Sequence, residues 1–341
     1  MLKLAVAGAG YFSQFQYDAW ERIPEVSLAG VYNRTPAKAA AMAEAHGNPP
    51  VFDDFTAMLD AVRPDIVDII TPPATHLVFA GAALDAGCHV ICQKPFTENL
   101  EQASELARKA ERLGKVLVVH ENFRFQPWYR EIRRQIEAGL LGDLYQATYR
   151  LRPGDGQGAD AYLARQPFFR DMKRFLIHET GVHLIDTFRS LFGNADWVFA
   201  DLRQLNPSIA GEDSGTVIFG YASGFRAVFD GNRLSDHVAE NRRLTMGELV
   251  IEGSKGTLSL TGDGEILFRA FGTNDFVQLA YEWKPVGFGA DCVYNLQRHV
   301  IDHIIAGTPL ENAARDYLTV MACEQAIYRS SQTGCRVTVG E

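Results

Sequence analysis

The first third of the sequence alternates short apolar runs with segments of helical periodicity, and this alternation restricts the possible fold more than any other feature. The runs LKLAVAG, VSLAGVYN, DIVDIIT, HVICQ and KVLVVH are nearly continuous in apolar residues, as expected for strands covered on both faces. Residues 99–113 repeat apolar side chains at helical spacing, between an expected N-cap at Asn99 and an expected stop at Gly114. Strands and helices in this order predict a parallel sheet with right-handed crossovers.

The sequence after residue 121 changes character and predicts a second domain. Runs such as SGTVIFGY, GELVIEG and EILFRAFG are separated by Gly, Asp and Asn, which indicates an antiparallel meander. Helices are expected near residues 128–138, from about His178 to Phe192, and towards the C-terminal end. Because single cores stop growing at about 250–300 residues, we expect two domains, 1–121 and 122–341. The second is expected to be α+β, with a large open, mainly antiparallel sheet and C-terminal helices.

Composition excludes several classes of function. The net charge is −9, because 42 Asp and Glu outweigh 33 Lys and Arg, and this argues against general affinity for nucleic acid or for anionic membranes. No stretch approaches the roughly 20 apolar residues that cross a bilayer, and LKLAVAGAG lacks the apolar core of a cleavable signal. The cysteines form no CxxC pair, which favours free thiols in a reducing compartment. We therefore expect a cytoplasmic protein.

The glycine motif after the first run predicts a dinucleotide site. Gly8 and Gly10 have the spacing at which one glycine makes a tight turn and the next lets the backbone approach a pyrophosphate at a helix N-terminus. Ser13 takes the third position, where glycine or alanine is usual, and is small enough to keep strand and helix close. Tyr11 and Phe12 are expected to contact nicotinamide or substrate, or else to pack the first helix. The motif and the parallel sheet together predict an α/β fold with an N-terminal Rossmann domain.

The ends of two further strands supply candidate cofactor contacts. The second expected strand ends at Asn33 and Arg34, where an acidic residue would bind the adenosine ribose and an arginine would accommodate a 2'-phosphate. Asparagine can still bond the ribose and Arg34 can stack on adenine, so these residues leave NAD and NADP equally open. The run DIVDIIT leads into Thr71 and Pro72, which suit a stiff loop against a flat ring. His76 in the same loop is either a cofactor contact or a residue at the start of the next helix.

A lysine and a histidine are further candidate site residues. Lys94 follows Gln93 at the end of the HVICQ strand, on the edge where parallel sheets bind ligands. Histidine titrates near neutrality, and His183 shares a face of its expected helix with Glu179 at i and i+4. His178 and His183, at i and i+5, would diverge by about 140° on a helix, so no metal site is predicted.

Taken in order along the chain, these motifs resemble one oxidoreductase family. GxGxxG, TPPxxH, a strand ending in KP, NFRF and TGVHLID resemble the glucose-fructose oxidoreductase and inositol dehydrogenase (Gfo/Idh/MocA) family over essentially the whole chain. The family pattern has Glu-Lys-Pro where this chain has Gln93, Lys94 and Pro95, and Asp-x-Gly-x-His where it begins with Glu179. The resemblance implies that Lys94 lies beside the nicotinamide and bonds the reacting hydroxyl, with Gln93 and Asn122 among the cofactor contacts.

The resemblance also implies an activity and a substrate class. Lys94 and His183 would be the catalytic residues of an NAD(P)-dependent enzyme that oxidises a CH–OH group of a sugar, polyol or related alcohol, and Glu179 would bind a substrate hydroxyl or orient the imidazole. The other substrate-binding candidates match NxRF or flank a glycine-bearing loop, and they are Asn122, Arg124, Arg152, Arg165 and Phe168. ICQKPF, HENFRF and HETGVH most resemble the D-apiose dehydrogenase branch, which implies an aldose oxidised to its lactone and slightly favours NAD. Family members further imply a homo-dimer or homo-tetramer.

Two alternatives stay open at this stage. A non-catalytic NAD(P)-binding regulator or sensor would need the glycine loop but neither Lys94 nor His183, so the presence of both residues argues against it. A reductase of a non-carbohydrate substrate, such as an imine, would be expected to have a less polar cleft than one flanked by Arg124, Arg152 and Arg165.

Overall fold

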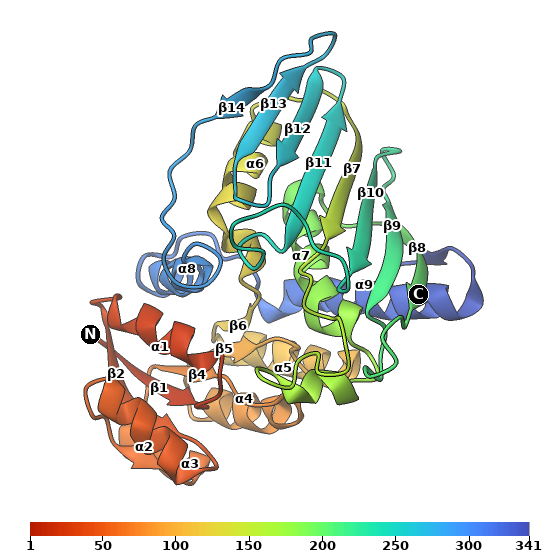
Figure 1. The fold of residues 1–341 in the computed structure, drawn as a ribbon. Helices are drawn as coiled ribbons and strands as arrows, with labels where there is room; N and C mark the ends of the chain where they lie inside the picture. Colours follow the sequence, from red (N-terminus) through yellow and green to blue (C-terminus); the bar gives the residue numbers. More distant parts are fainter. Residues whose placement is uncertain (341) are drawn as a thin grey trace. The chain divides into compact units, whose positions relative to one another are not determined.

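The structure is a computed structural model that describes residues 1–340 and divides into two compact units (Figure 1). The first unit contains Met1–Asn122 and Asp291–Leu318, and the second contains Phe123–Ala290 and the chain from Thr319 onward. The units differ from the expected domains in the segment Asp291–Leu318. That segment belongs with the first unit because Arg22 donates to both carboxylate oxygens of Asp291, each at 2.7 Å.

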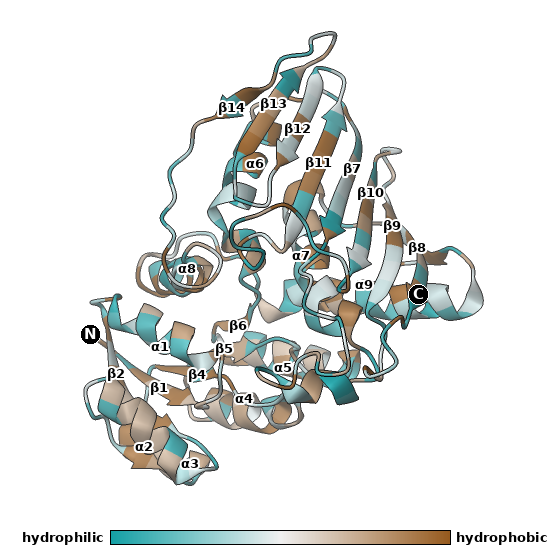
Figure 2. Cartoon of the chain, in the orientation of Figure 1, coloured by the Kyte–Doolittle hydropathy of each residue, from teal (hydrophilic) through white to brown (hydrophobic). Residues whose placement is uncertain are grey.

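A six-stranded parallel sheet forms the centre of the first unit, in the order β3-β2-β1-β4-β5-β6. The predicted parallel sheet is therefore confirmed. Its strands are β1 (Leu2–Ala7), β2 (Val26–Tyr32), β3 (Val51–Phe52), β4 (Ile66–Ile69), β5 (His89–Gln93) and β6 (Leu117–His120). The two-residue strand β3 was not expected. In Figure 2, β1 and β4 carry hydrophobic colour, since their apolar side chains are buried.

The helices that connect these strands are α1 (Ser13–Glu21), α2 (Pro36–Ala45), α3 (Phe55–Val62), α4 (His76–Asp85) and α5 (Leu100–Leu113). The helix α8 (Cys292–Ala306), which comes after β14 in the chain, belongs to the same unit. The Asn99 side chain accepts from the Gln102 amide at 2.9 Å, which caps the start of α5. Gly114 ends the same helix with φ of 62°, a left-handed conformation that glycine adopts without a steric penalty.

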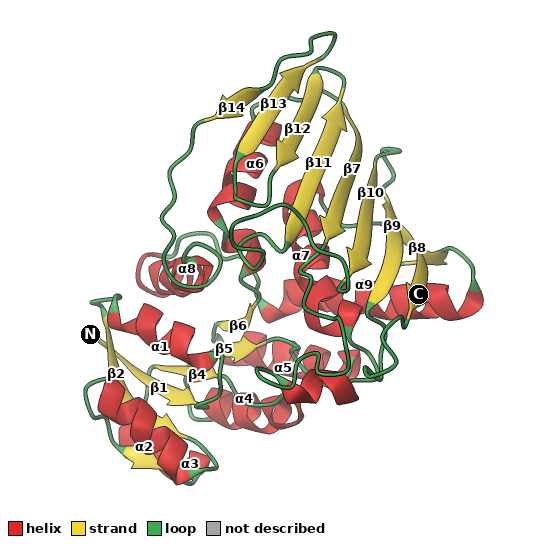
Figure 3. Ribbon diagram, in the orientation of Figure 1, coloured by secondary structure: helices red, strands yellow, loops and turns green. Residues whose placement is uncertain are grey.

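The second unit is built on a nine-stranded sheet, in the order β14-β13-β12-β11-β7-β10-β9-β8-β15 (Figure 3). All neighbouring pairs are antiparallel except β10 and β7, which are parallel. The strands are β7 (Leu144–Leu151), β8 (Trp197–Arg203), β9 (Ser214–Gly220), β10 (Arg226–Asn232), β11 (Gly247–Gly253), β12 (Gly256–Leu260), β13 (Ile266–Ala270), β14 (Val277–Leu279) and β15 (Val337–Thr338). The expected open, mainly antiparallel sheet is confirmed.

Helices cover one face of this sheet. The helices α6 (Pro127–Glu137) and α7 (Val182–Phe192) lie behind the strands in Figure 1, and Phe188 of α7 meets Phe219 of β9 edge to face at 5.5 Å between ring centroids. The last helix, α9 (Ala314–Thr333), adds its residues from Thr319 to this unit. The other face leaves side chains such as Val250 exposed. No helix within residues 1–340 has both the length and the apolar character needed to span a membrane.

The helix expected from about His178 differs in its first turns. The chain forms a π-helix over Leu176–Gly181, and the α-helix α7 starts only at Val182. The reason lies in the buried Glu212, whose Oε1 accepts from the amides of Phe175 and Ile177 at 3.1 and 3.2 Å and so fixes the start of this segment. The prediction that Glu179 and His183 share one continuous α-helix is therefore wrong.

Candidate active site

The glycine loop has the backbone that a dinucleotide site requires. Gly8 has φ of 125°, and a Cβ built on it would lie 2.7 Å from the carbonyl oxygen of Ile70, so only glycine fits here. At Gly10 nothing lies within 4 Å of such a Cβ, which leaves space beside the backbone. The Ser13 hydroxyl donates to the Gly10 carbonyl oxygen at 2.7 Å, holding the loop against the first turn of α1. The N-terminus of α1 follows this loop directly, and the amides of a helix N-terminus suit a phosphate group.

Asn33 stabilises this loop from the end of β2. Its Oδ1 accepts from the Ala9 amide at 3.1 Å, and its Nδ2 donates to the Thr35 carbonyl oxygen at 3.0 Å. The carboxamide thus fixes the glycine loop, and a ribose contact of Asn33 stays a prediction. Arg34 is exposed next to it.

His76 is the first residue of α4, which is one of the two roles expected for it. The side chain is fully buried, with Nε2 2.7 Å from the Thr71 carbonyl oxygen and Nδ1 2.8 Å from that of Phe96. Burial lowers the pKa of His76, while the backbone carbonyls around the ring oppose this shift. The imidazole therefore joins the loop after β4, which carries Thr71 and Pro72, to the loop after β5. These contacts give the histidine a structural role that requires no direct contact with a ligand.

Two aromatic residues directly precede α1. Tyr11 is 48% exposed, and Phe12 is half-buried. Both rings pack against Phe15, with ring centroids at 6.5 and 5.4 Å. Packing of the first helix, one of the two roles expected for them, is thus present in the structure.

Lys94 stands at the carboxyl end of β5, as the sequence indicates. The lysine is half-buried, and its peptide bond to Pro95 is cis. The Lys94 amide donates to Oε1 of Gln93 at 2.8 Å, and Nε2 of Gln93 donates to Oε1 of Gln16 at 3.3 Å. Gln93 thus folds back on the backbone of the residue that follows it.

In the second unit, His183 lies in the first turn of α7 and is 7% exposed. Its imidazole stacks on the ring of Phe123, with centroids 4.0 Å apart and planes within 4°. The Thr187 hydroxyl donates to the His183 carbonyl oxygen at 2.8 Å. Nearby along the chain, Glu179 accepts from the Thr180 hydroxyl at 2.5 Å and lies 3.6 Å from the Arg233 guanidinium.

The Arg124 side chain binds a partner that could not be predicted from the sequence. Its Nε and NH2 donate to the two carboxylate oxygens of Asp186 at 2.7 and 2.6 Å, and both side chains are buried. This bidentate pair ties the NFRF segment to α7, and a substrate contact of Arg124 stays a prediction. Asn122, in the first unit, has a buried Oδ1 without a hydrogen-bond partner in the structure, so its carboxamide retains an acceptor for a ligand.

The remaining substrate candidates lie on or beside the loop of residues 153–171. Arg152 pairs with Asp230 at 2.5 Å, and Arg165 lies 3.3 Å from a carboxylate oxygen of Asp155. Phe168 is 60% exposed and is therefore accessible to a ligand. Arg233 was not among the predicted site residues; it is buried and also binds Asp155. Its only sequence signal is an arginine two positions after the apolar run FRAVFDG.

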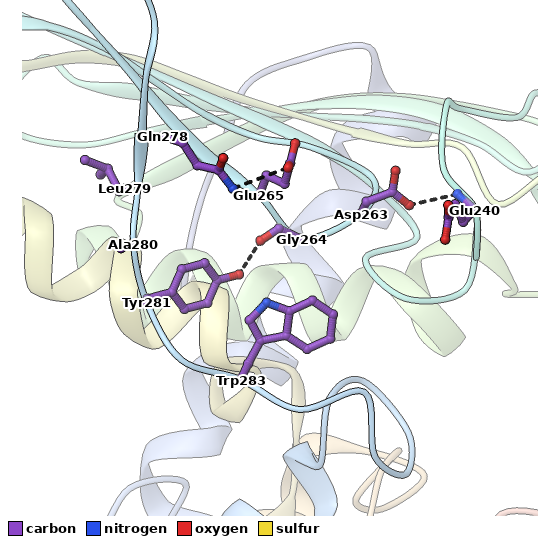
Figure 4. Close-up of a pocket in the computed structure, with 9 residues that line it drawn as sticks. All are labelled: Glu240, Asp263, Gly264, Glu265, Gln278, Leu279, Ala280, Tyr281 and Trp283. Carbon is purple, nitrogen blue, oxygen red and sulfur yellow. Dashed lines mark hydrogen bonds between the residues drawn. The ribbon is translucent and has the colours of Figure 1, made fainter.

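Figure 4 shows a pocket of about 490 Å³ elsewhere in the second unit. Gln278 donates to Glu265 at 3.3 Å, and the Tyr281 hydroxyl donates to the Gly264 carbonyl oxygen. None of the candidate residues above lines it; the lining residues are Glu240, Asp263, Gly264, Glu265, Gln278, Leu279, Ala280, Tyr281 and Trp283. Within residues 1–340, no cluster of three or more His, Cys, Asp or Glu side chains is arranged to hold a metal ion.

Comparison with known proteins identifies the family. Residues 2–121 match the model of the oxidoreductase family with an NAD-binding Rossmann fold, and residues 129–259 match the Gfo/Idh/MocA C-terminal domain. A D-apiose dehydrogenase from Paraburkholderia graminis is 31% identical over 337 residues, which cover 97% of this chain and 88% of that protein. The chain belongs to the Gfo/Idh/MocA oxidoreductase family.

Other members agree with this assignment. A D-apiose dehydrogenase from Rhizobium rhizogenes is 26% identical, covering 99% of this chain and 98% of that protein. An oxidoreductase from Agrobacterium radiobacter, solved in complex with NAD+, L-tartaric acid and magnesium, superimposes with a TM-score of 0.89 at 25% identity, covering 99% of this chain and 98% of that one. The predicted family, fold and nicotinamide cofactor are confirmed. This member of the sugar and polyol dehydrogenases is therefore an NAD(P)-dependent oxidoreductase acting on CH–OH groups.

The residues of the first unit fit this cofactor. Gly8 makes the tight turn, Gly10 leaves the backbone of the loop open to a pyrophosphate, and the first turn of α1 holds no acidic residue. The buried Oδ1 of Asn122 offers a further acceptor. The slight preference for NAD over NADP stays a prediction.

Proposed function

We propose that this enzyme oxidises a hydroxyl of an aldose, with D-apiose as the first candidate, to the corresponding lactone. The observation that supports this proposal is the similarity to two D-apiose dehydrogenases over nearly the full length of the chain. The chain also has both Lys94 and His183. A sensor protein would need neither residue.

The reaction requires a base and a site for negative charge. Oxidation removes a hydride from the carbinol carbon and a proton from its hydroxyl, and at the anomeric carbon of a cyclic aldose the product is a lactone. When bound, the nicotinamide supplies the hydride acceptor. His183 accepts the hydroxyl proton, and the Lys94 ammonium donates a hydrogen bond to the oxygen while negative charge develops on it.

The surroundings of His183 support its role as the base. The parallel stack on Phe123, at 4.0 Å between centroids, restricts the plane of the imidazole. The bond from Thr187 to the His183 carbonyl oxygen fixes the backbone of the same turn. A base held in one orientation loses little rotational freedom when the substrate hydroxyl arrives.

The substrate contacts are proposed on the chemistry of the remaining side chains. Glu179 accepts a hydrogen bond from a sugar hydroxyl, and Phe168, whose ring is exposed, covers an apolar face of the sugar. Arg152 and Arg165 donate hydrogen bonds to sugar hydroxyls through the guanidinium N–H groups that do not bind their carboxylate partners. Cofactor contacts are proposed for residues on the carboxyl edge of the parallel sheet, namely Gly8, Gly10, Tyr11, Phe12, Asn33, Arg34, Thr71, Pro72, Gln93, Lys94 and Asn122.

Nicotinamide absorbance tests the proposal. The enzyme is assayed with NAD or NADP against D-apiose, other aldoses, polyols and inositols, together with Lys94→Ala and His183→Ala. We expect turnover of D-apiose and a fall in kcat of roughly 10²–10⁴-fold in either variant. Lys109→Ala, at a surface lysine that pairs with Asp85, serves as the control and should keep the activity. Tight dinucleotide binding by calorimetry without turnover of any sugar would favour a sensor or a reductase of another substrate.

A further inference from the structure

A buried carboxylate lies in the strand next to the one that carries Lys94. Asp68 in β4 is fully buried, and β4 pairs directly with β5. The indole Nε1 of Trp20 donates to Oδ2 of Asp68 at 2.8 Å, and Nε2 of Gln16 lies 3.2 Å from each carboxylate oxygen. Both donors come from α1, the helix that follows the glycine loop.

This carboxylate sets the orientation of two amides in series. Because Nε2 of Gln16 faces Asp68, its Oε1 faces the other way and accepts from Nε2 of Gln93 at 3.3 Å. Gln93 therefore presents its own Oε1 to the Lys94 amide, at 2.8 Å. Each carboxamide has one acceptor end and one donor end. The orientation of Gln16 at Asp68 therefore determines the orientation of Gln93 at Lys94.

We propose that Asp68 is the positioning residue for the Lys94 strand end, and that its carboxylate, acting through Gln16, makes glutamine the side chain that position 93 requires. The expected effect on catalysis rests on the proposed function of Lys94, whereas the hydrogen-bond series itself does not depend on that function.

The proposal accounts for the departure from the family pattern Glu-Lys-Pro. A glutamate at position 93 would place a carboxylate oxygen against Oε1 of Gln16, where two acceptors would face each other without a proton. It would also add a second negative charge close to buried Asp68, and burying an unpaired charge is costly. Glutamine at position 93 avoids both effects. The buried negative charge is then that of Asp68, which lies on the neighbouring strand.

The groups packed around Asp68 do not compete for this role. Tyr17 on α1 and Cys92 on β5 are its titratable neighbours. Burial, reinforced by the charge of Asp68, raises the pKa of Tyr17 and of Cys92. Both groups therefore stay neutral near physiological pH, and the Tyr17 hydroxyl donates to the Gly8 carbonyl oxygen at 3.1 Å.

A thermal double-mutant cycle tests the series without any substrate. The full chain, Asp68→Asn, Gln93→Glu and the double variant are unfolded at about pH 8, where the Asp68 carboxylate is charged. Gln93→Glu should lower Tm by roughly 3–8 °C. The double variant should recover most of this loss, because a carboxamide at position 68 can donate to Oε1 of Gln16 and let Nε2 turn towards a carboxylate at position 93. Asp85→Asn, at an exposed carboxylate of α4, should give no recovery. Additive shifts in the Asp68 cycle would overturn the proposal.

Kinetics then test the effect on Lys94. Gln93→Glu should lower kcat/KM by roughly 10-fold, and the double variant should regain most of it. If Asp68 had a purely structural role, the substitutions would change stability, but the double variant would not regain kcat/KM. The comparison uses variants that are folded at the assay temperature. If the wild type turns over no sugar, the thermal cycle still decides the inference. If the wild type is active and the cycle is additive, the proposed function stands and the inference fails.

Discussion

The Arg233 guanidinium donates to both carboxylate oxygens of Asp155, with Nε 3.2 Å from Oδ1 and NH2 2.9 Å from Oδ2. Its NH1 donates to the Thr180 hydroxyl at 2.7 Å and lies 3.6 Å from Glu179. The cation also stacks on Phe175, 4.7 Å from the ring centroid. One buried cation thus ties the loop of residues 153–171 to the turn that precedes His183.

Arg233→Met is expected to loosen this loop. Removing the cation leaves Asp155 and Glu179 without their shared partner, so the free energy of unfolding should fall by about 2–4 kcal/mol. The KM for the sugar should rise by a larger factor than kcat falls, because the loop carries the proposed substrate contacts. Denaturant unfolding and steady-state kinetics measure the two effects.

A surface ion pair provides the matched control for this prediction. Arg203 pairs with Asp201, and the side chains are 66% and 54% exposed. Arg203→Met should leave the free energy of unfolding close to that of the wild type, because water screens an exposed ion pair. Equal losses in the two variants would show that Arg233 contributes no more than an exposed arginine.

The two glycines of the nucleotide loop should respond differently to alanine. Gly8→Ala forces a Cβ to within 2.7 Å of the Ile70 carbonyl oxygen at a φ of 125°, so both stability and dinucleotide affinity should fall. Gly10→Ala meets no atom within 4 Å. It should therefore keep the stability within about 1 kcal/mol and weaken only the binding of the dinucleotide. Thermal unfolding and calorimetric titration with NAD separate the two effects, and a Gly10 variant that binds NAD normally would contradict this placement of the pyrophosphate.

Features that depend on neighbouring residues could be predicted from the sequence. The Asn99 cap, the Gly114 stop and the turn at Gly8 each follow from the conformational preference of one residue and its neighbours along the chain. The alternation of apolar runs and helical segments likewise predicts the parallel sheet, because it reflects burial on both faces of each strand.

Pairings between distant residues could not be predicted from the sequence. Arg124 was expected to bind substrate, yet its partner Asp186 lies 62 positions further on, and a single sequence shows a charge without its counterion. Arg233 and Asp155 are 78 positions apart and become neighbours only through the fold. The π-helical turn before α7 likewise depends on Glu212, which lies more than 30 positions after it in the chain.

The Arg124 pair predicts a large loss of stability for Asp186→Ala. Asp186 is fully buried and accepts from Arg124 and from Arg189, at 2.6 and 3.2 Å. Its removal leaves the buried Arg124 cation without this carboxylate, so the free energy of unfolding should fall by about 3–5 kcal/mol. Asp201→Ala removes an exposed carboxylate and should leave the free energy of unfolding nearly unchanged. A small loss at Asp186, measured by urea unfolding, would show that water or another group replaces the carboxylate.

Asp68 predicts a pH dependence of stability with a defined sign. Burial raises the pKa of Asp68 to about 7, although hydrogen bonds from Trp20 and Gln16 oppose the shift. An aspartate in the unfolded chain releases its proton near pH 3.9, about three units lower. The folded state therefore binds the extra proton between about pH 4 and pH 7, and the contribution of Asp68 to stability falls as the pH rises through this window, by roughly 4 kcal/mol in total.

Asp68→Asn removes this titration and should make the protein more stable than the wild type at about pH 8, by up to roughly 4 kcal/mol. The gap should shrink as the pH falls towards about 4, since the wild-type carboxyl is then neutral in both states. Urea unfolding of both proteins at a series of pH values measures it. A variant that is less stable than the wild type at about pH 8, with the gap narrowing at lower pH, would mean that the bonds from Trp20 and Gln16 outweigh the cost of burying the charge.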